Sequence, residues 1–460
     1  MLSAALGMPV VSSCSEDDPE NPEVPPPGEG GDEDPDDPSG GDTPGGTATL
    51  SVSQQKQKLK DAGLELTGKF SASDFRYYSD LSEHVDGTLF EDYRTTELED
   101  WYEDCLDVIT SFLHKEESSN PWGYNYVTTY NKRIYAASAF KGHFKAQNGR
   151  WVRTDADDLQ FTFPDQTGAT CVVRLAAGGR TKTVYVSDTE DWDWAYDTQY
   201  ITVRENYLSV PENVTLTLTQ NGLTKVSVSV KTDLSSMAGE EFDLSRDAFS
   251  ATADVKVDSY AWTVSRAAYR AGGQAGLASE LKKGGQLLLS VKASADRLGF
   301  DADDELTAGD KVTFEADVLG KVQFKGEISN IKDFVNYLKR ADENNDSESS
   351  FKSNLNMAGN LLKTGVYYDG NPTRQAGVKL EPFSYRAPWG GEDWWYEPVI
   401  YFDQDGSSVS ILEDFFNEED FGEVIDKFEQ LVEDFREMLG LDDEWDEPYY
   451  PTPDEYNRRK

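Results

Sequence analysis

Apolar residues recur at helical spacing between residues 53 and 114. Leu59, Ala62, Leu66 and Phe70 fall three or four positions apart, which predicts a helix over residues 53–70. A stronger pattern of the same period covers residues 96–114 and includes Trp101. Its first half is rich in Asp and Glu, which suits the positive end of a helix dipole. We therefore expect residues 49–125 to form a helical N-terminal segment.

The period changes from about 3.6 to 2 near residue 126. Val226, Val228 and Val230 alternate with polar residues, and similar short runs continue to residue 330. Turn pairs such as Asn148-Gly149, Gly178-Gly179 and Asn221-Gly222 separate the runs. Short spacing and tight turns favour an antiparallel sheet over residues 126–330, with one buried and one wetter face, rather than βαβ units.

Helical patterns return after the sheet, at residues 331–340 and 347–362, and extended runs follow at residues 378–385 and 396–402. The last predicted helix starts at Asn417, a good N-cap, and ends at residue 439. It carries one apolar stripe, which consists of Phe421, Val424, Ile425, Phe428, Leu431, Val432 and Phe435. The predicted fold class is α+β: a large antiparallel β-meander with N-terminal helices, a helical hairpin and a C-terminal amphipathic helix packed on it. We expect residues 331–440 to share one body with the sheet, and the acidic tail 441–460 to be flexible.

A short apolar run at residues 2–11 leads into the sequence Val11-Ser12-Ser13-Cys14. This resembles the lipobox of a bacterial lipoprotein signal peptide. The run is too short to span a bilayer as a helix, which needs ~20 residues. The resemblance implies that residues 1–14 hold the signal peptide and the lipobox cysteine, so that Cys14 carries the lipid that anchors the protein in a membrane. The basic n-region is missing, so we expect the true start codon to lie upstream; a chance apolar N-terminus is the competing interpretation.

Residues 15–48 contain twelve Asp or Glu, no Lys or Arg, and many Pro and Gly. Such a segment cannot bury enough apolar surface to fold, so it is predicted to be a disordered, extended tether. An acidic run directly after the cysteine resembles the surface-export signal of Bacteroidetes-type lipoproteins. That resemblance implies an outer-membrane protein, lipid-anchored and facing the cell exterior.

The rest of the chain resembles an uncharacterised outer-surface lipoprotein family of gut Bacteroidetes, a domain of unknown function. The resemblance rests on the stretches Trp101-Tyr102-Glu103-Asp104-Cys105, Asp233-Leu234-Ser235-Ser236-Met237, Thr364-Gly365-Val366-Tyr367-Tyr368-Asp369-Gly370-Asn371 and Glu413-Asp414-Phe415-Phe416-Asn417. The family implies no catalytic residue.

The chain has 86 acidic and 43 basic residues, a formal net charge of −43. Such a surface repels phosphate backbones, so nucleic acid is excluded as a partner, and the simplest role of the charge is solubility. Cys105 and Cys171 both fall on apolar faces; one disulfide between them is an alternative, but buried free thiols are favoured. We expect a monomer that uses no cofactor.

Two segments combine tryptophan with carboxylates, and they contain Trp192 and Trp194, and Trp394 and Trp395. Indole faces beside hydrogen-bond acceptors suit sugar binding, and paired carboxylates are also what glycoside hydrolysis uses. Because Asp and Glu are abundant, their proximity is expected by chance, and core packing is the default interpretation.

No HExxH, CxxC or GxSxG motif occurs, so no catalytic or metal-binding residue is assigned, and Asp405-Gly406 is predicted to be a hairpin turn rather than part of a calcium loop. The leading hypothesis is a non-enzymatic binding module for a glycan, peptide or apolar ligand. A structural component of a surface complex is the alternative, and a carbohydrate-active hydrolase comes third.

Overall fold

The computed structural model describes residues 48–106, 110–119, 125–195, 198–386, 392–402, 404–410 and 421–439. All of them belong to one structural unit that begins at Thr47. Cys14, nearly all of the tether 15–48, the expected N-cap Asn417 and the tail 441–460 lie outside the described residues.

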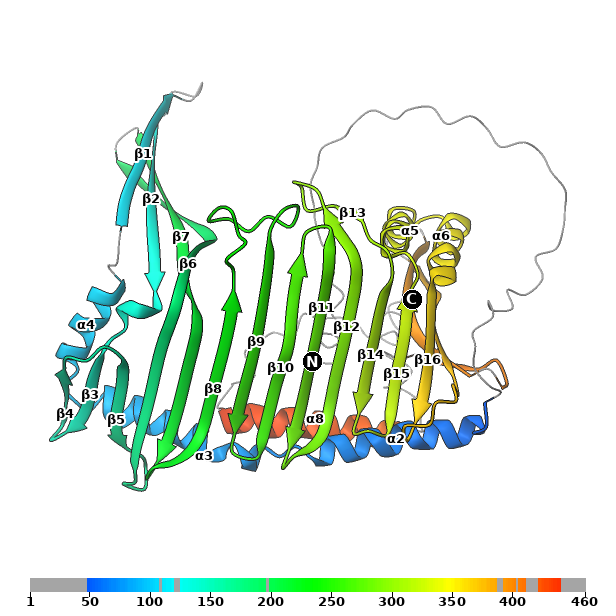
Figure 1. Ribbon diagram of the computed structural model, residues 1–460, viewed down its shortest axis with the longest axis horizontal. Coiled ribbons are helices and arrows are strands. Elements are labelled where there is room, and N and C mark those ends of the chain that lie inside the picture. Colours follow the sequence, from blue (N-terminus) through cyan, green and yellow to red (C-terminus); the bar gives the residue numbers. More distant parts are fainter. Residues whose placement is uncertain are drawn as a thin grey trace. The chain divides into compact units, whose positions relative to one another are not determined.

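A single sheet of 16 strands dominates the unit (Figure 1), and a separate sheet of three strands lies near its C-terminal end. The strands of the large sheet are β1 (Thr110–Ser119), β2 (Asn125–Ala136), β3 (Gly142–Gln147), β4 (Arg150–Thr154), β5 (Leu159–Pro164), β6 (Thr170–Ala195), β7 (Thr198–Gln220), β8 (Leu223–Asp233), β9 (Ala248–Val257), β10 (Tyr260–Arg270), β11 (Gly273–Lys283), β12 (Gln286–Phe300), β13 (Leu306–Ala308), β14 (Val312–Val318), β15 (Val322–Ile328) and β16 (Leu362–Tyr368). The small sheet contains β17 (Gly377–Arg386), β18 (Glu392–Tyr401) and β19 (Ser408–Ser410). The predicted α+β class with a large β-meander is confirmed.

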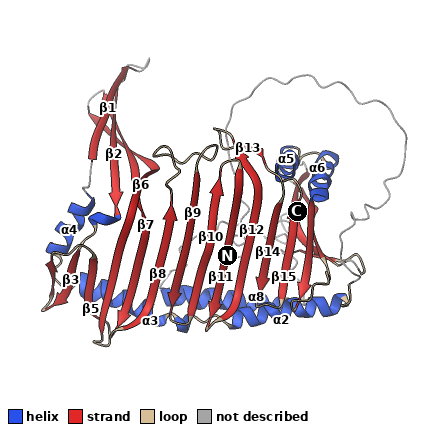
Figure 2. Ribbon diagram, viewed as in Figure 1, coloured by secondary structure: helices blue, strands red, loops and turns tan. Residues whose placement is uncertain are grey.

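The helices lie at the margins of the large sheet (Figure 2). They are α2 (Val52–Gly68), α3 (Arg76–His84), α4 (Thr96–Leu106), α5 (Ile331–Glu343), α6 (Glu348–Leu361) and α8 (Gly422–Leu439), with short turns η1 (Ala72–Asp74), η2 (Val85–Phe90) and η3 (Ala137–Ala139). Helix α2 starts in a capping box, because Ser51 accepts from the Gln54 backbone and the Gln54 side chain accepts from the Ser51 backbone. In Figure 1, α2, α3 and α8 run along one end of the strands.

The large sheet is mixed rather than wholly antiparallel, which corrects the prediction for residues 126–330. Consecutive strands from β7 to β12 pair antiparallel, but β2 pairs parallel with β7 and β3 pairs parallel with β5. Both parallel pairs join strands that are not consecutive in the sequence: β3 to β6 lie between β2 and β7, and β4 lies between β3 and β5. Turn residues between neighbouring strands carry no information about such a distant pairing.

Two local predictions were wrong because the residues pair with a neighbouring strand instead. The helix expected over residues 96–114 ends at Leu106, and residues 110–119 form strand β1, which pairs with β2. Gly178-Gly179 is not a turn: β6 continues through it, with a register shift between Gly178 and Thr181 and a φ of +84° at Gly179. A bulge with one left-handed glycine keeps the strand paired while bending it.

The central strands form a single layer with two different faces. Val228, Val255, Trp262, Leu281 and Leu289 lie in register along one row, on one face of β8 to β12. The neighbouring row on the opposite face is polar and contains Ser229, Asp254, Thr263, Glu280 and Ser290. Apolar and polar residues alternate as the sequence predicted, but the apolar row is not a buried one, since Trp262 is 47% exposed, whereas Ser290 of the polar row is 8% exposed.

The hydrophobic cores lie toward the two ends of the large sheet. One cluster packs α3, η2 and α4 on β3 to β8, and includes Trp101, Phe144, Trp151 and Cys171. The others gather α2, α5, α6 and residue Phe421 against β14 to β18. Strands β9, β10 and β11, which are described throughout, contribute no residue to any of these clusters.

Helix α8 packs beside α2 with only part of its predicted apolar stripe buried. Phe421 is 0% exposed and Val424 is 7% exposed, whereas Phe428 and Val432 are 37% and 41% exposed. The expectation that the helix lies against apolar surface therefore holds for its beginning. Phe428, which the periodicity places at the centre of the stripe, is not a core residue.

Candidate functional site

Strands β6 and β7 are much longer than their neighbours, and together with β2 and β1 they form a ribbon that extends beyond the rest of the sheet (Figure 1). The order across the ribbon is β1–β2–β7–β6. Strand β5 pairs with β6 over residues 170–175, and in the part of the chain that the structure describes no other strand besides β7 pairs with the later part of β6. Alternate residues on this ribbon point to opposite faces, so each face can be read from the register.

One face of the ribbon carries four aromatic residues, and we call it the aromatic face: the exposed Trp192 and Trp194 and the half-buried Tyr126 and Tyr130. Trp192 and Trp194 are 57% and 54% exposed. Gln199 of β7 pairs with Trp194 on one side and with Tyr126 on the other, so these residues form one row across the ribbon. Tyr130 lies in the row of Val203 and Glu190, on the same face. Residues two apart on a strand share a face about 7 Å apart, so the two indoles stand side by side.

Carboxylates accompany these indoles. The Trp192 indole Nε1 donates to Glu190 Oε2 at 3.2 Å, and the Trp194 backbone N–H donates to Asp193 Oδ1 at 2.8 Å. Glu190 shares the aromatic face, whereas Asp193 pairs with Tyr200 on the opposite one. The aromatic face therefore offers apolar ring surface with a hydrogen-bond acceptor at its margin.

The sequence hypothesis grouped all four tryptophans, and the structure does not bring them together. Trp394 and Trp395 lie in β18 of the small sheet. Trp394 packs 6.3 Å from Phe351 between ring centroids, with Lys352 Nζ 4.4 Å from its ring. Trp395 stacks on Phe383, and both indoles are half-buried. These two residues pack the C-terminal part of the unit, as the default interpretation held.

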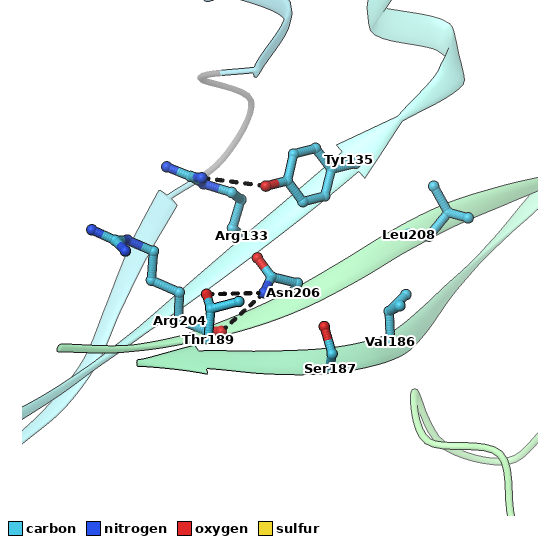
Figure 3. Close-up of a pocket in the computed structure, with 8 residues that line it drawn as sticks. All are labelled: Arg133, Tyr135, Val186, Ser187, Thr189, Arg204, Asn206 and Leu208. Atoms are coloured by element: carbon cyan, nitrogen blue, oxygen red, sulfur yellow. Dashed lines mark hydrogen bonds between the residues drawn. The ribbon is translucent and has the colours of Figure 1, made fainter. Parts of the chain in front are cut away.

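The opposite face of the ribbon holds a groove of about 490 Å³ that sequence reasoning missed (Figure 3). Its lining consists of Arg133 and Tyr135 from β2, Val186, Ser187 and Thr189 from β6, and Arg204, Asn206 and Leu208 from β7. Figure 3 shows both guanidinium groups at one end, the hydroxyl and amide groups between, and the aliphatic side chains at the other end. No local signal could have found it, because the parallel pairing of β2 with β7 creates it.

The polar groups of the groove are unevenly satisfied. Arg204 forms an ion pair with Asp191, and Asn206 Nδ2 donates to Thr189 Oγ1 at 3.3 Å and to the Arg204 carbonyl oxygen at 3.2 Å. Arg133 donates from Nη1 to the Tyr135 hydroxyl at 3.2 Å. The Arg133 Nε is buried and has no hydrogen-bond acceptor among the described residues.

Other candidate chemistry has a structural explanation. Asp405 accepts from the Ser407 hydroxyl at 2.6 Å and from its backbone N–H at 2.9 Å, and these bonds lower the pKa of the Asp405 carboxyl. Gly406 has a φ of +74°, as a turn requires. Within the described ranges, no three His, Cys, Asp or Glu side chains gather closely enough to hold a metal ion. None of the described helices is long and apolar enough to cross a membrane.

Comparisons with models of protein families, with curated proteins and with solved structures find no match to this chain.

Proposed function

We propose that this chain is a lipid-anchored, non-enzymatic binding protein of the outer cell surface, and that the aromatic face of the ribbon binds a glycan. The observation that carries the proposal is the exposure of Trp192 and Trp194, 57% and 54%, at adjacent same-face positions of one strand. Large aromatic side chains left in water at the end of a projecting element are typical of recognition surfaces.

The chemistry of the aromatic face suits a neutral, hydroxylated ligand. The C–H face of a pyranose ring packs on an indole, and the hydroxyl groups at the ring edge donate to a carboxylate such as Glu190, which already accepts from Trp192. The net charge of −43 would oppose an anionic polymer over most of the surface, but does not oppose a neutral one. A tethered anchor would hold this face away from the membrane.

A glycan array probed with the purified chain, followed by titration of the best ligand, tests the proposal. We expect the double variant Trp192→Ala/Trp194→Ala to bind roughly tenfold or more weakly than the wild type, because indoles dominate such contacts. Trp262→Ala is the matched control, since Trp262 is 47% exposed but lies on β10. Equal losses in both variants, or no glycan bound by the wild type, would contradict the proposal.

The anchor needs a separate test, because Cys14 lies outside the described residues. We expect the wild-type protein, expressed in a bacterium that processes lipoproteins, to partition into the detergent phase. Cys14→Ala should move it to the aqueous phase. A Cys14→Ala protein that still partitions with detergent would contradict the lipoprotein proposal and leave the glycan test unaffected.

One observation favours a second candidate, a structural component of a surface complex. The central strands span the distance between the cores as a single layer with no core cluster of their own. A long sheet of this kind could serve as a spacer. A spacer should show no ligand-dependent rise in melting temperature with any member of a glycan panel, whereas a receptor must.

A further inference from the structure

We propose that the groove on the opposite face of the ribbon is a binding site for a sugar acid, a small molecule that carries one carboxylate and several hydroxyl groups. The site is formed by Arg133, Arg204, Ser187, Thr189 and Asn206. This inference does not depend on the aromatic face, which lies on the other side of the same strands.

The groove contains more positive than negative groups. The chain has twice as many acidic as basic residues, yet the groove brings two guanidinium groups together and, among the described residues, one carboxylate pairs with them, that of Asp191. Arg133 forms no ion pair among the described residues, so the groove keeps an excess of one positive charge. A cation retained without a carboxylate partner in so acidic a protein points to a ligand that supplies the missing negative charge.

The Arg133 Nε lacks a hydrogen-bond acceptor among the described residues. A buried polar atom without a hydrogen-bond partner is costly, and such atoms are few in native structures. The Tyr135 hydroxyl occupies one side of the Arg133 guanidinium, through Nη1, while the buried Nε lacks an acceptor. The edge that contains Nε is therefore unused, and it can receive both oxygens of a planar carboxylate once a rotation of the side chain brings the buried Nε to the groove.

Charged, polar and aliphatic side chains follow one another along the groove. From the arginine end, Figure 3 shows Thr189, Asn206 and Ser187, then the aliphatic Val186 and Leu208. Val186 and Leu208 are 61% and 43% exposed, so they offer apolar contact that no described part of the chain covers. A volume of about 490 Å³ lies in the usual range for small-molecule sites. A sugar acid combines a carboxylate with a ring that carries hydroxyl groups at its edge and C–H groups on its face, so it can supply all three kinds of contact.

The charge also favours a carboxylate over phosphate or sulfate. The excess in the groove is one positive charge, which a monoanion neutralises. A phosphate or sulfate dianion can also pair with a guanidinium edge, but it would leave a surplus negative charge near Asp191. A monoanion such as a carboxylate therefore fits best.

Isothermal titration of the purified chain with D-glucuronate at low ionic strength tests the inference, with D-glucose and sodium sulfate as parallel arms. We expect glucuronate to bind at least tenfold more tightly than glucose or sulfate, and binding to weaken as salt is added. Arg133→Met keeps the length of the side chain and removes its charge, and should weaken glucuronate binding at least tenfold. Arg76→Met is the matched control and should leave glucuronate binding unchanged, because Arg76 lies on α3, outside the groove, with its side chain 76% exposed.

A second measurement keeps the inference testable if Arg133→Met fails to fold. The Arg133 Nε–H signal of the wild-type protein in a nitrogen-15 NMR spectrum should shift on addition of glucuronate and not of glucose. Equal binding of glucuronate and glucose, tighter binding of sulfate, no binding of glucuronate, or an Arg133 signal that does not move would each overturn the proposal.

Discussion

The hydroxyl of Tyr260 on β10 donates to the carboxylate of Asp74 in η1 at 2.8 Å. Lys283 on β11 donates to the same carboxylate at 2.6 Å, and the rings of Phe70 and Phe75 pack on Tyr260 with centroids 5.8 and 5.0 Å away. This contact attaches the N-terminal helices to central strands that lack a core cluster. A polar network with aromatic cover therefore connects helix and sheet here.

Acid should loosen this contact. The hydrogen bond from Lys283 lowers the pKa of the Asp74 carboxyl, and that from Tyr260 adds to the effect against the opposing influence of burial. A depressed pKa stabilises the fold above the unfolded value of about 3.9, and the contribution is lost as pH falls through the folded value. We expect Asp74→Asn to lower the free energy of unfolding at pH 7 by about 1 kcal/mol, and to show a smaller loss of stability than the wild type from pH 5 to pH 3.

Urea unfolding at pH 7, 5, 4 and 3 measures this difference. Asp155→Asn is the control, since the Asp155 side chain is 97% exposed and should leave the pH profile unchanged. Parallel profiles for the wild type and Asp74→Asn would show that Asp74 does not contribute.

The start of α8, not its centre, should carry its packing energy. Phe421 is fully buried in the cluster with Leu59 and Ile400, whereas Phe428 is 37% exposed. We expect Phe421→Ala to lower the free energy of unfolding by about 3–5 kcal/mol and Phe428→Ala by about 1 kcal/mol. Chemical denaturation of the two variants compares them directly, and equal losses would contradict the observed burial.

Helices α2 and α8 approach closely at a glycine. A Cβ atom on Gly63 would lie 2.9 Å from Val424 Cγ1, closer than carbon atoms pack without movement. We expect Gly63→Ala to destabilise the protein by about 1 kcal/mol, although alanine favours helix. Gly68→Ala is the control, because a Cβ atom on Gly68 of the same helix would have no atom within 4 Å, and this variant should be neutral or stabilising. Thermal melts compare the two variants, and a gain of stability in both would rule out the close contact.

Cys105 and Cys171 are both buried, and neither forms a disulfide within the described residues. Burial raises the pKa of the Cys171 thiol, and the Asp165 carboxylate raises it further, although a hydrogen bond with Tyr77 acts in the other direction. Cys105 contacts the Ala139 carbonyl oxygen at 3.2 Å. In a Cys14→Ala background, Ellman's reagent should find both thiols unreactive in the native protein and both reactive in guanidinium chloride without a reductant. Denatured protein with no reactive thiol would instead indicate a disulfide.

Local signals in the sequence were reliable where the determinant is local. Asn148-Gly149 and Asn221-Gly222 do form the turns of β3–β4 and β7–β8, with positive φ at all four residues. The alternation of β8 to β12, the helical hairpin and the turn at Gly406 follow from the same kinds of pattern, because a turn needs specific backbone angles and a strand exposes alternate side chains to different faces.

By itself, the sequence therefore determined the fold class and the position of most strands. The exposure of Trp192 and Trp194 was decided by the tertiary structure, since core packing was the default interpretation for both. Only the tertiary structure decided that residues 110–119 leave the helix to pair with β2, and that Trp394 and Trp395 belong to another sheet. It also placed Arg133 beside Arg204, through a parallel pairing of strands far apart in the chain. The physical reason is that hydrophobic period and turn chemistry act within a few residues, whereas strand partners are selected by the packing of the whole sheet.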